Sequence, residues 1–338
     1  MKLFKVVGDP TNQKRFSSHI IIDSLNKAAQ KLGHYAEDEI VICYDGVCNS
    51  HGYSPDAFIC SYEIAFAQNI LKQAGGKPIF GVSRDNQQFI LDGGYPAELT
   101  DWFLLGVDSS IYPCVTKTKN LNKFCVGVYT ESLVRGGVEL CLEAFCKTVQ
   151  KHEAKLLIKD RNATPVFEKW VKDRRDHYDA DIEYLNCHFS STDQIIDWFS
   201  GVDIHLYLNR SSTFAMPPAE SACMGIPTIA MSYSGPREFI FDRNTGMNPK
   251  YTLEYIDKDF GRLLNIGTRN FFFWEDYLKR PVWAVPDMDS VGECMTELRN
   301  NKVLFNDISV NGTKFMKGIN WENSAESLYL KVNKFHDR

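Results

Sequence analysis

The feature that most constrains the fold is a repeated alternation of short apolar strands and amphipathic helices, arranged in two blocks. The first block predicts strands at 4–7, 39–44, 57–61 and 78–82, with helices at 19–32 and 64–73. The second block predicts strands at 123–128, 155–159, 182–185, 203–208 and 228–231, with helices at 137–150, 164–173 and 193–199. Strand–helix–strand repeats with short connections are typical of parallel α/β sheets. We therefore expect two parallel α/β units in tandem.

The alternation stops between the two blocks. There Thr116-Lys117-Thr118-Lys119-Asn120 forms a polar run that is typical of a linker. A chain of 338 residues is also too long for one typical hydrophobic core. The sequence therefore predicts a first domain at 1–115, a linker at 116–122 and a second domain at 123–320, with a final helix at 321–335 that could pack back on the first domain.

One part of the second block, residues 245–282, lacks a clear periodicity. It contains the aromatic run Phe271-Phe272-Phe273-Trp274, which we interpret as part of an insertion or a capping helix. Such a run belongs more often to a core or an interface than to a platform for a sugar.

Composition limits the classes of function. The net charge of −5 disfavours a general nucleic-acid coat, although a local basic groove stays open. No apolar run approaches the roughly 18 residues of a membrane span. The ten cysteines form no CxxC pair and often lie in apolar runs, so we expect reduced thiols in a cytoplasmic protein. The eight histidines show neither HxxxH nor HExxH spacing, which argues against a metal site built by the protein.

The stretch 217–238 carries the strongest local signal. Glu220 is expected in the first turn of a helix, at the positive end of the helix dipole, where its carboxylate can accept hydrogen bonds from N–H groups or from a polyol. Gly225 fits the end of that helix, and Pro227 prevents the helix from continuing. A short buried strand follows, and the loop Ser234-Gly235-Pro236 then lets backbone N–H groups approach a ligand.

Five segments of the chain occur in the order that one known family shows. They are residues 15–19, the run from Leu105 to Pro113, the start of a helix from Arg135 to Phe145, the stretch 220–238 and the closing segment 321–325. Each segment alone is a weak signal, but the ordered set is specific. Over about residues 1–330 the chain resembles the retaining GT-B glycosyltransferases of the family-four type.

This resemblance implies an α/β GT-B fold, in which two Rossmann-like domains with parallel sheets face a central cleft. It implies that a UDP- or GDP-linked sugar is bound as a substrate, mainly by the second domain and outside the carboxyl ends of the strands. It also implies transfer to an acceptor hydroxyl held by the first domain, with no metal and no other cofactor. In this family the acceptor attacks from the face that the nucleotide leaves, and the departing phosphate takes up the proton.

Matched positions assign candidate roles to the acids. Glu220 would bind the ribose hydroxyls, since an ionised carboxylate can accept two adjacent hydroxyl donors; the alternative is a helix-cap acid without a ligand. The family places another glutamate eight residues earlier, against the transferred sugar, where this chain has Ser212. That departure points to an unusual donor, to a smaller sugar such as a pentose, or to a shifted alignment. Glu238 matches the acid that follows the second loop.

A departing nucleoside diphosphate needs positive charge to stabilise it. The positions where the family has an arginine and a lysine are Val128 and Gly136 here. Arg135, one residue earlier, and Lys159, at the end of a buried strand, are the candidate substitutes. A solvated residue at a helix start is the alternative for Arg135, although a cation is not favoured there. We count Arg135 and Lys159 as catalytic candidates, together with Ser212 and His19.

The other candidates are assigned by position. Those on the donor side are Ser211, Thr213, Gly235, His188, Phe189, Lys14 and Arg15. His188 or Phe189 could stack on a nucleobase; the alternative is that the aromatic residue belongs to the core. For His19 the alternative to a role in the site is a capping or core histidine. Candidate contacts of the acceptor are Tyr62, Glu63, Arg84 and Asp85.

The acceptor stays open at this point. A soluble glycan is the default, because no basic, apolar surface for a membrane lipid is apparent. A hydroxymethylated base in viral DNA is the first alternative, and it would need a narrow basic groove from Lys14, Arg15, Lys117, Lys119 and Lys123. A GT-B sugar-nucleotide epimerase and a non-catalytic sugar-nucleotide binder are further alternatives. A nicotinamide dehydrogenase is disfavoured, because the loop after the first strand lacks GxGxxG. The sugar, the nucleotide and the oligomeric state are not specified by the sequence.

Overall fold

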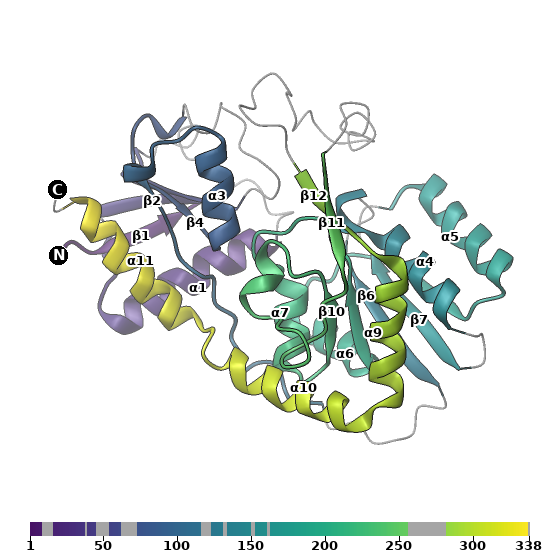
Figure 1. Ribbon diagram of the computed structural model, residues 1–338. Coiled ribbons are helices and arrows are strands. Elements are labelled where there is room, and N and C mark those ends of the chain that lie inside the picture. Colours follow the sequence, from purple (N-terminus) through teal and green to yellow (C-terminus); the bar gives the residue numbers. More distant parts are fainter. Residues whose placement is uncertain are drawn as a thin grey trace.

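A computed structural model describes residues 1–8, 16–37, 39–44, 54–61, 73–115, 123–130, 134–149, 153–160, 163–255 and 282–336, with the backbone alone at 16–18 and 134. It contains two parallel five-stranded sheets, which lie on opposite sides of the molecule in Figure 1. None of the helices in these ranges is both long and apolar enough to cross a membrane.

The first sheet has the order β1-β2-β3-β4-β5, and every neighbouring pair is parallel. Its strands are β1 (Phe4–Val7), β2 (Ile40–Tyr44), β3 (Ala57–Cys60), β4 (Ile79–Gly81) and β5 (Thr100–Trp102), with α1 (Phe16–Leu32) and α3 (Arg84–Asp92) between them. All four residues of β3 are buried, as expected for a strand covered on both faces. Neither α3 nor β5 was predicted from the sequence. Residues 64–72 of the helix expected between β3 and β4 lie outside the described part.

The second sheet has the order β10-β9-β6-β7-β8, again with parallel neighbours. Its strands are β6 (Phe124–Tyr129), β7 (Ala154–Asp160), β8 (Ile182–Asn186), β9 (Ile204–Tyr207) and β10 (Thr228–Ala230). The connecting helices are α4 (Val138–Thr148), α5 (Pro165–Tyr178), α6 (Thr192–Ser200) and α7 (Met216–Cys223). The two Rossmann-like α/β domains expected from the sequence are thus confirmed.

After β10 the chain departs from the simple alternation. β11 (Tyr251–Tyr255) and β12 (Val282–Pro286) pair antiparallel, although no regular element was predicted at 251–255. The aromatic run at 271–274 lies outside the described residues. α9 (Met288–Asn300) packs on α4, α10 (Lys302–Met316) packs on α7, and neither helix was predicted.

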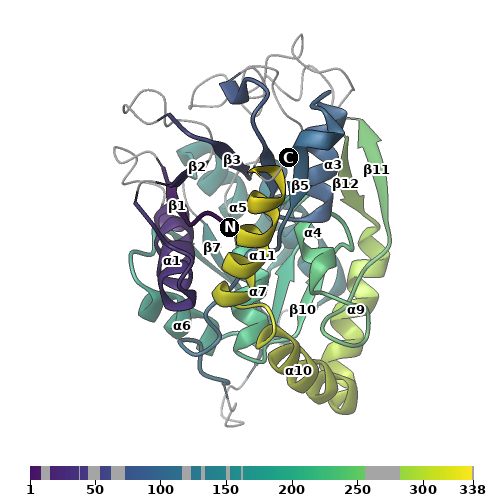
Figure 2. The ribbon, with the colours of Figure 1, turned by 90° about the vertical axis from the view of Figure 1, so that its left-hand side faces the viewer.

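The last helix, α11 (Trp321–His336), returns to the first domain and packs on α1 (Figure 2). Asn333 exchanges two hydrogen bonds with the backbone of Lys2, at 2.6 and 3.0 Å. The His34 ring stacks on Tyr329 at 3.8 Å between ring centres. The chain therefore crosses between the domains twice, once in each direction.

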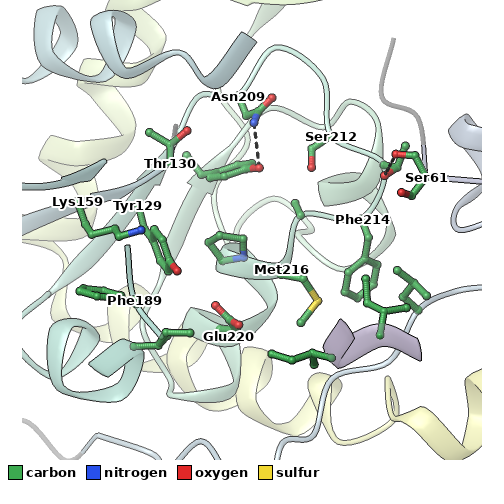
Figure 3. A pocket seen from close by; sticks show the side chains of 18 of the residues that line it. Ser61, Tyr129, Thr130, Lys159, Phe189, Asn209, Ser212, Phe214, Met216 and Glu220 are labelled. Carbon is green, nitrogen blue, oxygen red and sulfur yellow. Dashed lines mark hydrogen bonds between the residues drawn. The ribbon is translucent and has the colours of Figure 1, made fainter. Parts of the chain in front are cut away.

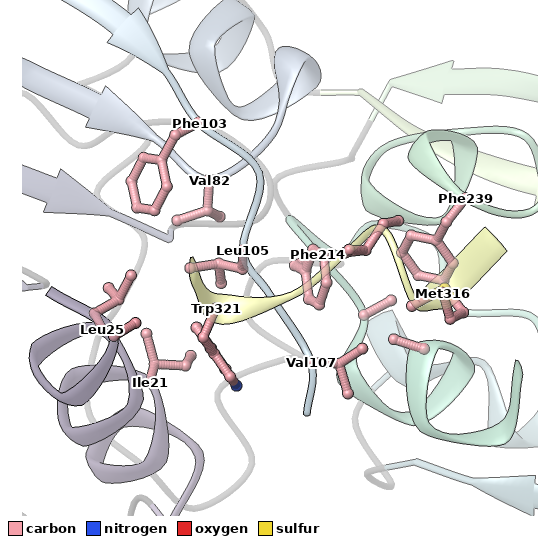
Figure 4. Packing of buried hydrophobic residues seen from close by; sticks show 14 of the residues in the cluster. Ile21, Leu25, Val82, Phe103, Leu105, Val107, Phe214, Phe239, Met316 and Trp321 are labelled. Atoms are coloured by element: carbon pink, nitrogen blue, oxygen red, sulfur yellow. The ribbon is translucent and has the colours of Figure 1, made fainter. Parts of the chain in front are cut away.

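One hydrophobic cluster spans both domains where the two crossings meet (Figure 4). Leu105, on the outgoing segment, lies close to Trp321 on the returning one. The backbone N–H of Val107 donates to the carbonyl of Ile319 at 3.0 Å. Gly106 is required at this crossing, because a Cβ atom there would lie 2.4 Å from the backbone of Asn320 and Trp321. The junction between the domains is therefore a packed core.

Two local expectations need correction. The helix that carries Glu220 begins at Met216, because Pro217 fits its first turn, so Glu220 lies in the second turn and not at the positive end of the dipole. The described cysteines are free thiols except Cys43, which is disulfide-bonded, so the expectation of reduced cysteines is wrong at this position.

The domains are also joined by two crossed contacts, one between Arg84 and Glu238 and the other between Asp85 and Arg237. The carboxylate of Glu238 accepts a hydrogen bond from the backbone N–H of Arg84 at 3.1 Å and lies 3.8 Å from its Nε. The Arg237 guanidinium donates to Asp85 Oδ1 at 2.8 Å. The second Asp85 oxygen is buried without a hydrogen bond. The start of α3 is thereby tied to the short helix Gly235–Glu238 of the other domain.

A double-mutant cycle of Asp85→Ala and Arg237→Ala should give a coupling energy of about 0.5–1 kcal/mol in urea unfolding, because Arg237 is partly exposed. The exposed pair Lys169–Asp173 within α5 is a matched control, and its coupling should be smaller. Additive effects of the Asp85 and Arg237 substitutions would show that this pair does not hold the domains together.

Candidate functional site

A cavity of about 230 Å³ lies between the domains, at the carboxyl ends of both parallel sheets (Figure 3). Tyr44 and Ser61 border it where β2 and β3 end, and Tyr129 and Tyr207 where β6 and β9 end. In doubly wound folds ligands bind outside these strand ends. The cavity is therefore where the topology would place a substrate.

Glu220 is the acid of this cavity. Its side chain is 6% exposed, and its Oε1 accepts a hydrogen bond from the Tyr112 hydroxyl at 2.9 Å. Burial raises the pKa of the Glu220 carboxyl to about 7, although the Tyr112 hydrogen bond and the charge of Lys159 act in the opposite direction. Among the described residues, no group donates to Oε2. Near neutral pH this carboxyl can thus gain or lose its proton.

Lys159 provides a buried positive charge on the other side of the cavity. It is 1% exposed, and its Nζ lies 4.4 Å from the ring centre of Tyr129 and 4.8 Å from that of Phe189. Burial lowers the pKa of Lys159 to about 8, against the effects of Cys187, Asp160 and Glu220. Within the described residues no carboxylate lies within ion-pair distance of Nζ. A buried ammonium group that contacts aromatic faces, with no carboxylate at ion-pair distance among the described residues, is well suited to bind an anion.

Arg135 supplies a second cation to the cavity wall. One guanidinium N–H donates to the carbonyl of Ser211 at 3.0 Å, which fixes the direction of the side chain. The next residues form the start of α4, where Gly137 has φ of 67° and a Cβ would lie 2.2 Å from the carbonyl oxygen of Leu208. Glycine is therefore needed to bring Arg135 close to the end of β9.

The loop before α7 forms the part of the wall that contains Ser212. The Ser212 carbonyl accepts hydrogen bonds from Gly235 N at 2.6 Å and from Ser234 Oγ at 2.7 Å. Thr213 Oγ1 donates across the cleft to the Ser61 carbonyl at 3.1 Å. Ala215 has φ of 69°, a left-handed conformation that costs of order 1 kcal/mol outside glycine. Contacts from both domains thus hold this loop in a strained conformation.

The structure brings seven of the predicted site residues together as lining of the cavity. They are Arg135, Lys159, His188, Phe189, Ser212, Thr213 and Glu220. Other candidates that the structure describes are not lining residues, namely His19, Ser211, Gly235 and Glu238. Lys14, Arg15, Tyr62 and Glu63 lie outside the described residues. Arg84 and Asp85 lie in the crossed contacts between the domains.

Two of these positions have a clear structural explanation. A Cβ atom on Gly235 would lie 2.5 Å from Cα of Phe214, so this glycine allows the two loops to pack closely. Glu238 contacts Arg84 instead of the cavity. Sequence reasoning did not identify Tyr112 or Tyr129 as site residues. Tyr129 could have been found as the last residue of a strand beside Lys159, whereas the Tyr112 contact joins residues 108 positions apart.

Comparisons with known proteins agree with this architecture. Residues 117–250 match the family model described as glycosyl transferases group 1. No curated protein matches the chain. A glycosyltransferase from Rickettsia africae has 13% identity and a TM-score of 0.65, with 98% of each chain covered. HepE from Anabaena, solved with UDP-glucose, has 10% identity and a TM-score of 0.64, with 100% of this chain and 99% of HepE covered.

Sucrose-phosphate synthase from Thermosynechococcus elongatus is another similar structure, with 11% identity and a TM-score of 0.63. The match covers 96% of this chain and 80% of the synthase. At these identities the likeness establishes the arrangement of the two domains. The chain therefore has the GT-B fold of these glycosyltransferases, and its residues 117–250 are similar to the group 1 glycosyl transferases.

Proposed function

We propose that the protein is a retaining glycosyltransferase that binds a nucleotide-sugar in the cavity and transfers the sugar to an acceptor hydroxyl. The observation that carries this proposal is the pairing of a buried carboxyl, Glu220, with a buried and unneutralised ammonium group, Lys159, in one cavity. A nucleotide-sugar offers both complementary groups, a vicinal diol on the ribose and a charged diphosphate. HepE, which shares the fold, was solved with UDP-glucose, and this supports a UDP-linked donor.

In the proposed complex Glu220 accepts hydrogen bonds from the ribose hydroxyls. Lys159 and Arg135 face the diphosphate and stabilise the negative charge that develops as the sugar leaves. These two cations take the part that a metal ion plays in other transferases, so we propose a metal-independent reaction. Ser212 and Thr213 lie where the sugar would be, and their hydroxyl groups suit an uncharged sugar.

The retaining course is supported by the acids available. Among the described residues that line the cavity, Glu220 is the only carboxylate, and the ribose occupies it in this proposal. A departing phosphate oxygen is then the group left to accept the proton of the acceptor hydroxyl. The bond from the sugar to the phosphate breaks as the bond to the acceptor oxygen forms on the same face.

For the acceptor we propose a soluble glycan. The alternative of a modified base in DNA requires a basic groove, and four of its five candidate residues lie outside the described part. The fifth, Lys123, forms an ion pair with Asp181 at 2.7 Å. No feature of the described cavity therefore favours DNA.

A panel of UDP- and GDP-sugars tests the proposal, first by thermal shift and then by turnover with labelled donor in the presence of a chelator. We expect one donor to stabilise the protein and its sugar to be transferred to a glycan. Label transfer to hydroxymethylated DNA and not to glycans would overturn the proposed acceptor. Isomerisation of the donor without an acceptor would favour an epimerase, and binding without any turnover would favour a non-catalytic binder.

The affinity for an intact nucleotide-sugar should depend on pH through both buried groups. It should rise about fivefold between pH 6 and 8, because the carboxyl of free Glu220 has a pKa of about 7 and its ionised form is the better acceptor, while Lys159 is already half deprotonated at pH 8. It should fall again above the Lys159 pKa of about 8, as the ammonium group loses its proton. Isothermal titration with a nucleotide-sugar checks this, because its diphosphate diester does not titrate in this range. A Glu220→Gln variant should lose the rising limb only.

A further inference from the structure

Tyr112 lies on the segment that leaves the first domain, and its side chain reaches into the second domain. It is 6% exposed, and its hydroxyl donates a hydrogen bond of 2.9 Å to Glu220 Oε1. Three residues later, the backbone N–H of Val115 donates to the carbonyl of Met224, at the end of α7, at 3.0 Å. The segment is thus fixed to the helix of Glu220 at two points, one of which is the carboxylate itself.

This hydrogen bond is the direct contact that orients the Glu220 carboxylate. Within the described part of the chain, Tyr112 is the one group that donates to this side chain. Lys159 acts on Glu220 through its charge, without a hydrogen bond. The other titratable groups around Glu220, on α7 and on the described elements that border the same cavity, are Cys223, Tyr44, Tyr129, Arg135, His188 and Tyr207.

We propose that Tyr112 is a positioning residue for the donor site, which holds the Glu220 carboxylate through Oε1 and leaves Oε2 directed to the ribose of a bound nucleotide-sugar. This inference rests on the proposed function, since it assigns Tyr112 a part in the same binding event. Tyr112 donates to the ionised carboxylate, so it favours the form of Glu220 that best accepts ribose hydroxyls. Because Tyr112 belongs to the segment that leaves the first domain, this segment takes part in donor binding through its contact with Glu220.

The test is Tyr112→Phe, which removes the hydroxyl group and keeps the ring. Without its donor the buried carboxylate is less stable, so the midpoint of the rising limb of nucleotide-sugar affinity should move up by about one pH unit. The affinity at pH 7 should fall about fivefold, and the difference from the wild type should shrink as the pH rises. In a Glu220→Gln background, the Tyr112→Phe substitution should not shift any pH midpoint.

Tyr95→Phe is the matched control, because Tyr95 is similarly buried and donates to the backbone carbonyl of Lys77 at 2.6 Å, away from the cavity. It should lower stability without moving the midpoint. An unchanged midpoint in Tyr112→Phe, or an equal shift in Tyr95→Phe, would overturn the inference.

A second measurement is independent of the ligand. NMR titration of the Glu220 carboxyl carbon in the unliganded protein, assigned with the Glu220→Gln variant, should show the same upward shift in Tyr112→Phe. If the wild type binds no nucleotide-sugar at any pH, the proposed function fails, whereas this titration still decides whether Tyr112 controls the carboxylate.

Discussion

The Glu220→Ala variant is expected to bind nucleotide-sugars about a hundredfold more weakly than the wild type. The substitution removes a buried acceptor of the ribose hydroxyls, and hydrogen bonds to a charged group contribute about 1.5–3 kcal/mol each. Isothermal titration with the donor found in the nucleotide-sugar panel measures the loss. Glu326→Ala on α11 is a control of the same chemistry, because Glu326 contacts His34 far from the cavity.

The Glu220→Gln variant separates binding from folding. The folded-state pKa of Glu220, about 7, is above its ordinary value of 4.5. The stability that the protonated carboxyl contributes is therefore fully present below about pH 4.5 and is lost as the pH rises through 7. The free energy of unfolding of unliganded Glu220→Gln, measured relative to the wild type, should therefore be up to about 3 kcal/mol higher at pH 8 than at pH 4.5.

Tight donor binding that survives Glu220→Ala would remove Glu220 from the donor site.

The second large effect is expected at Lys159. Lys159→Met should lower kcat of sugar transfer by about 10²–10³-fold, because the charge that develops on the diphosphate loses its buried counter-ion. The same variant should unfold at a higher temperature than the wild type at pH 7. In the wild type the pKa of Lys159, about 8, is below the ordinary 10.5. The free-energy cost of burying this charge is therefore present below pH 8 and disappears as the pH approaches 10.5. That cost is about 2–3 kcal/mol.

Lys155→Met on the same strand is the matched control, because Lys155 is partly exposed and paired with Glu183. It should change neither kcat nor the unfolding temperature by a comparable amount. Loss of both activity and stability in Lys159→Met would indicate a structural role for Lys159, and retained activity would contradict its assignment to the diphosphate.

The sequence predicted the two sheets well because buried parallel strands have a simple signature. β3 and β4 are apolar runs with every residue buried, and runs of this kind between helices can be recognised without any tertiary information. β5 could not be found in this way, because its three residues, Thr-Asp-Trp, become a strand only by pairing with β4. The start of α7 was missed for a different reason, since Pro217 and Pro218 fit a loop as well as a first helical turn.

The candidate site could be predicted only in part. Lys159 lies at the carboxyl end of β7, whereas Arg135 and Glu220 lie in the segments that follow β6 and β9. Their grouping follows from the order of the strands, because the carboxyl ends of these parallel strands meet at one edge of the sheet. Their roles stay predictions. The contact between Tyr112 and Glu220 depends on how the segment between the domains passes over α7, and no local pattern specifies that path. No local pattern specifies the contact of Glu238 either. Glu238 follows the loop Ser234-Gly235-Pro236 closely in sequence, but it contacts Arg84 of the other domain.

The most direct test of the account is a crystal structure of the protein with an intact nucleotide-sugar. We predict a ribose hydroxyl within about 3 Å of Glu220 Oε2 and a diphosphate oxygen within about 3 Å of Lys159 Nζ, with the sugar beside Ser212. A nucleotide bound elsewhere, or bound in this cavity with neither Glu220 nor Lys159 in contact with it, would contradict the account.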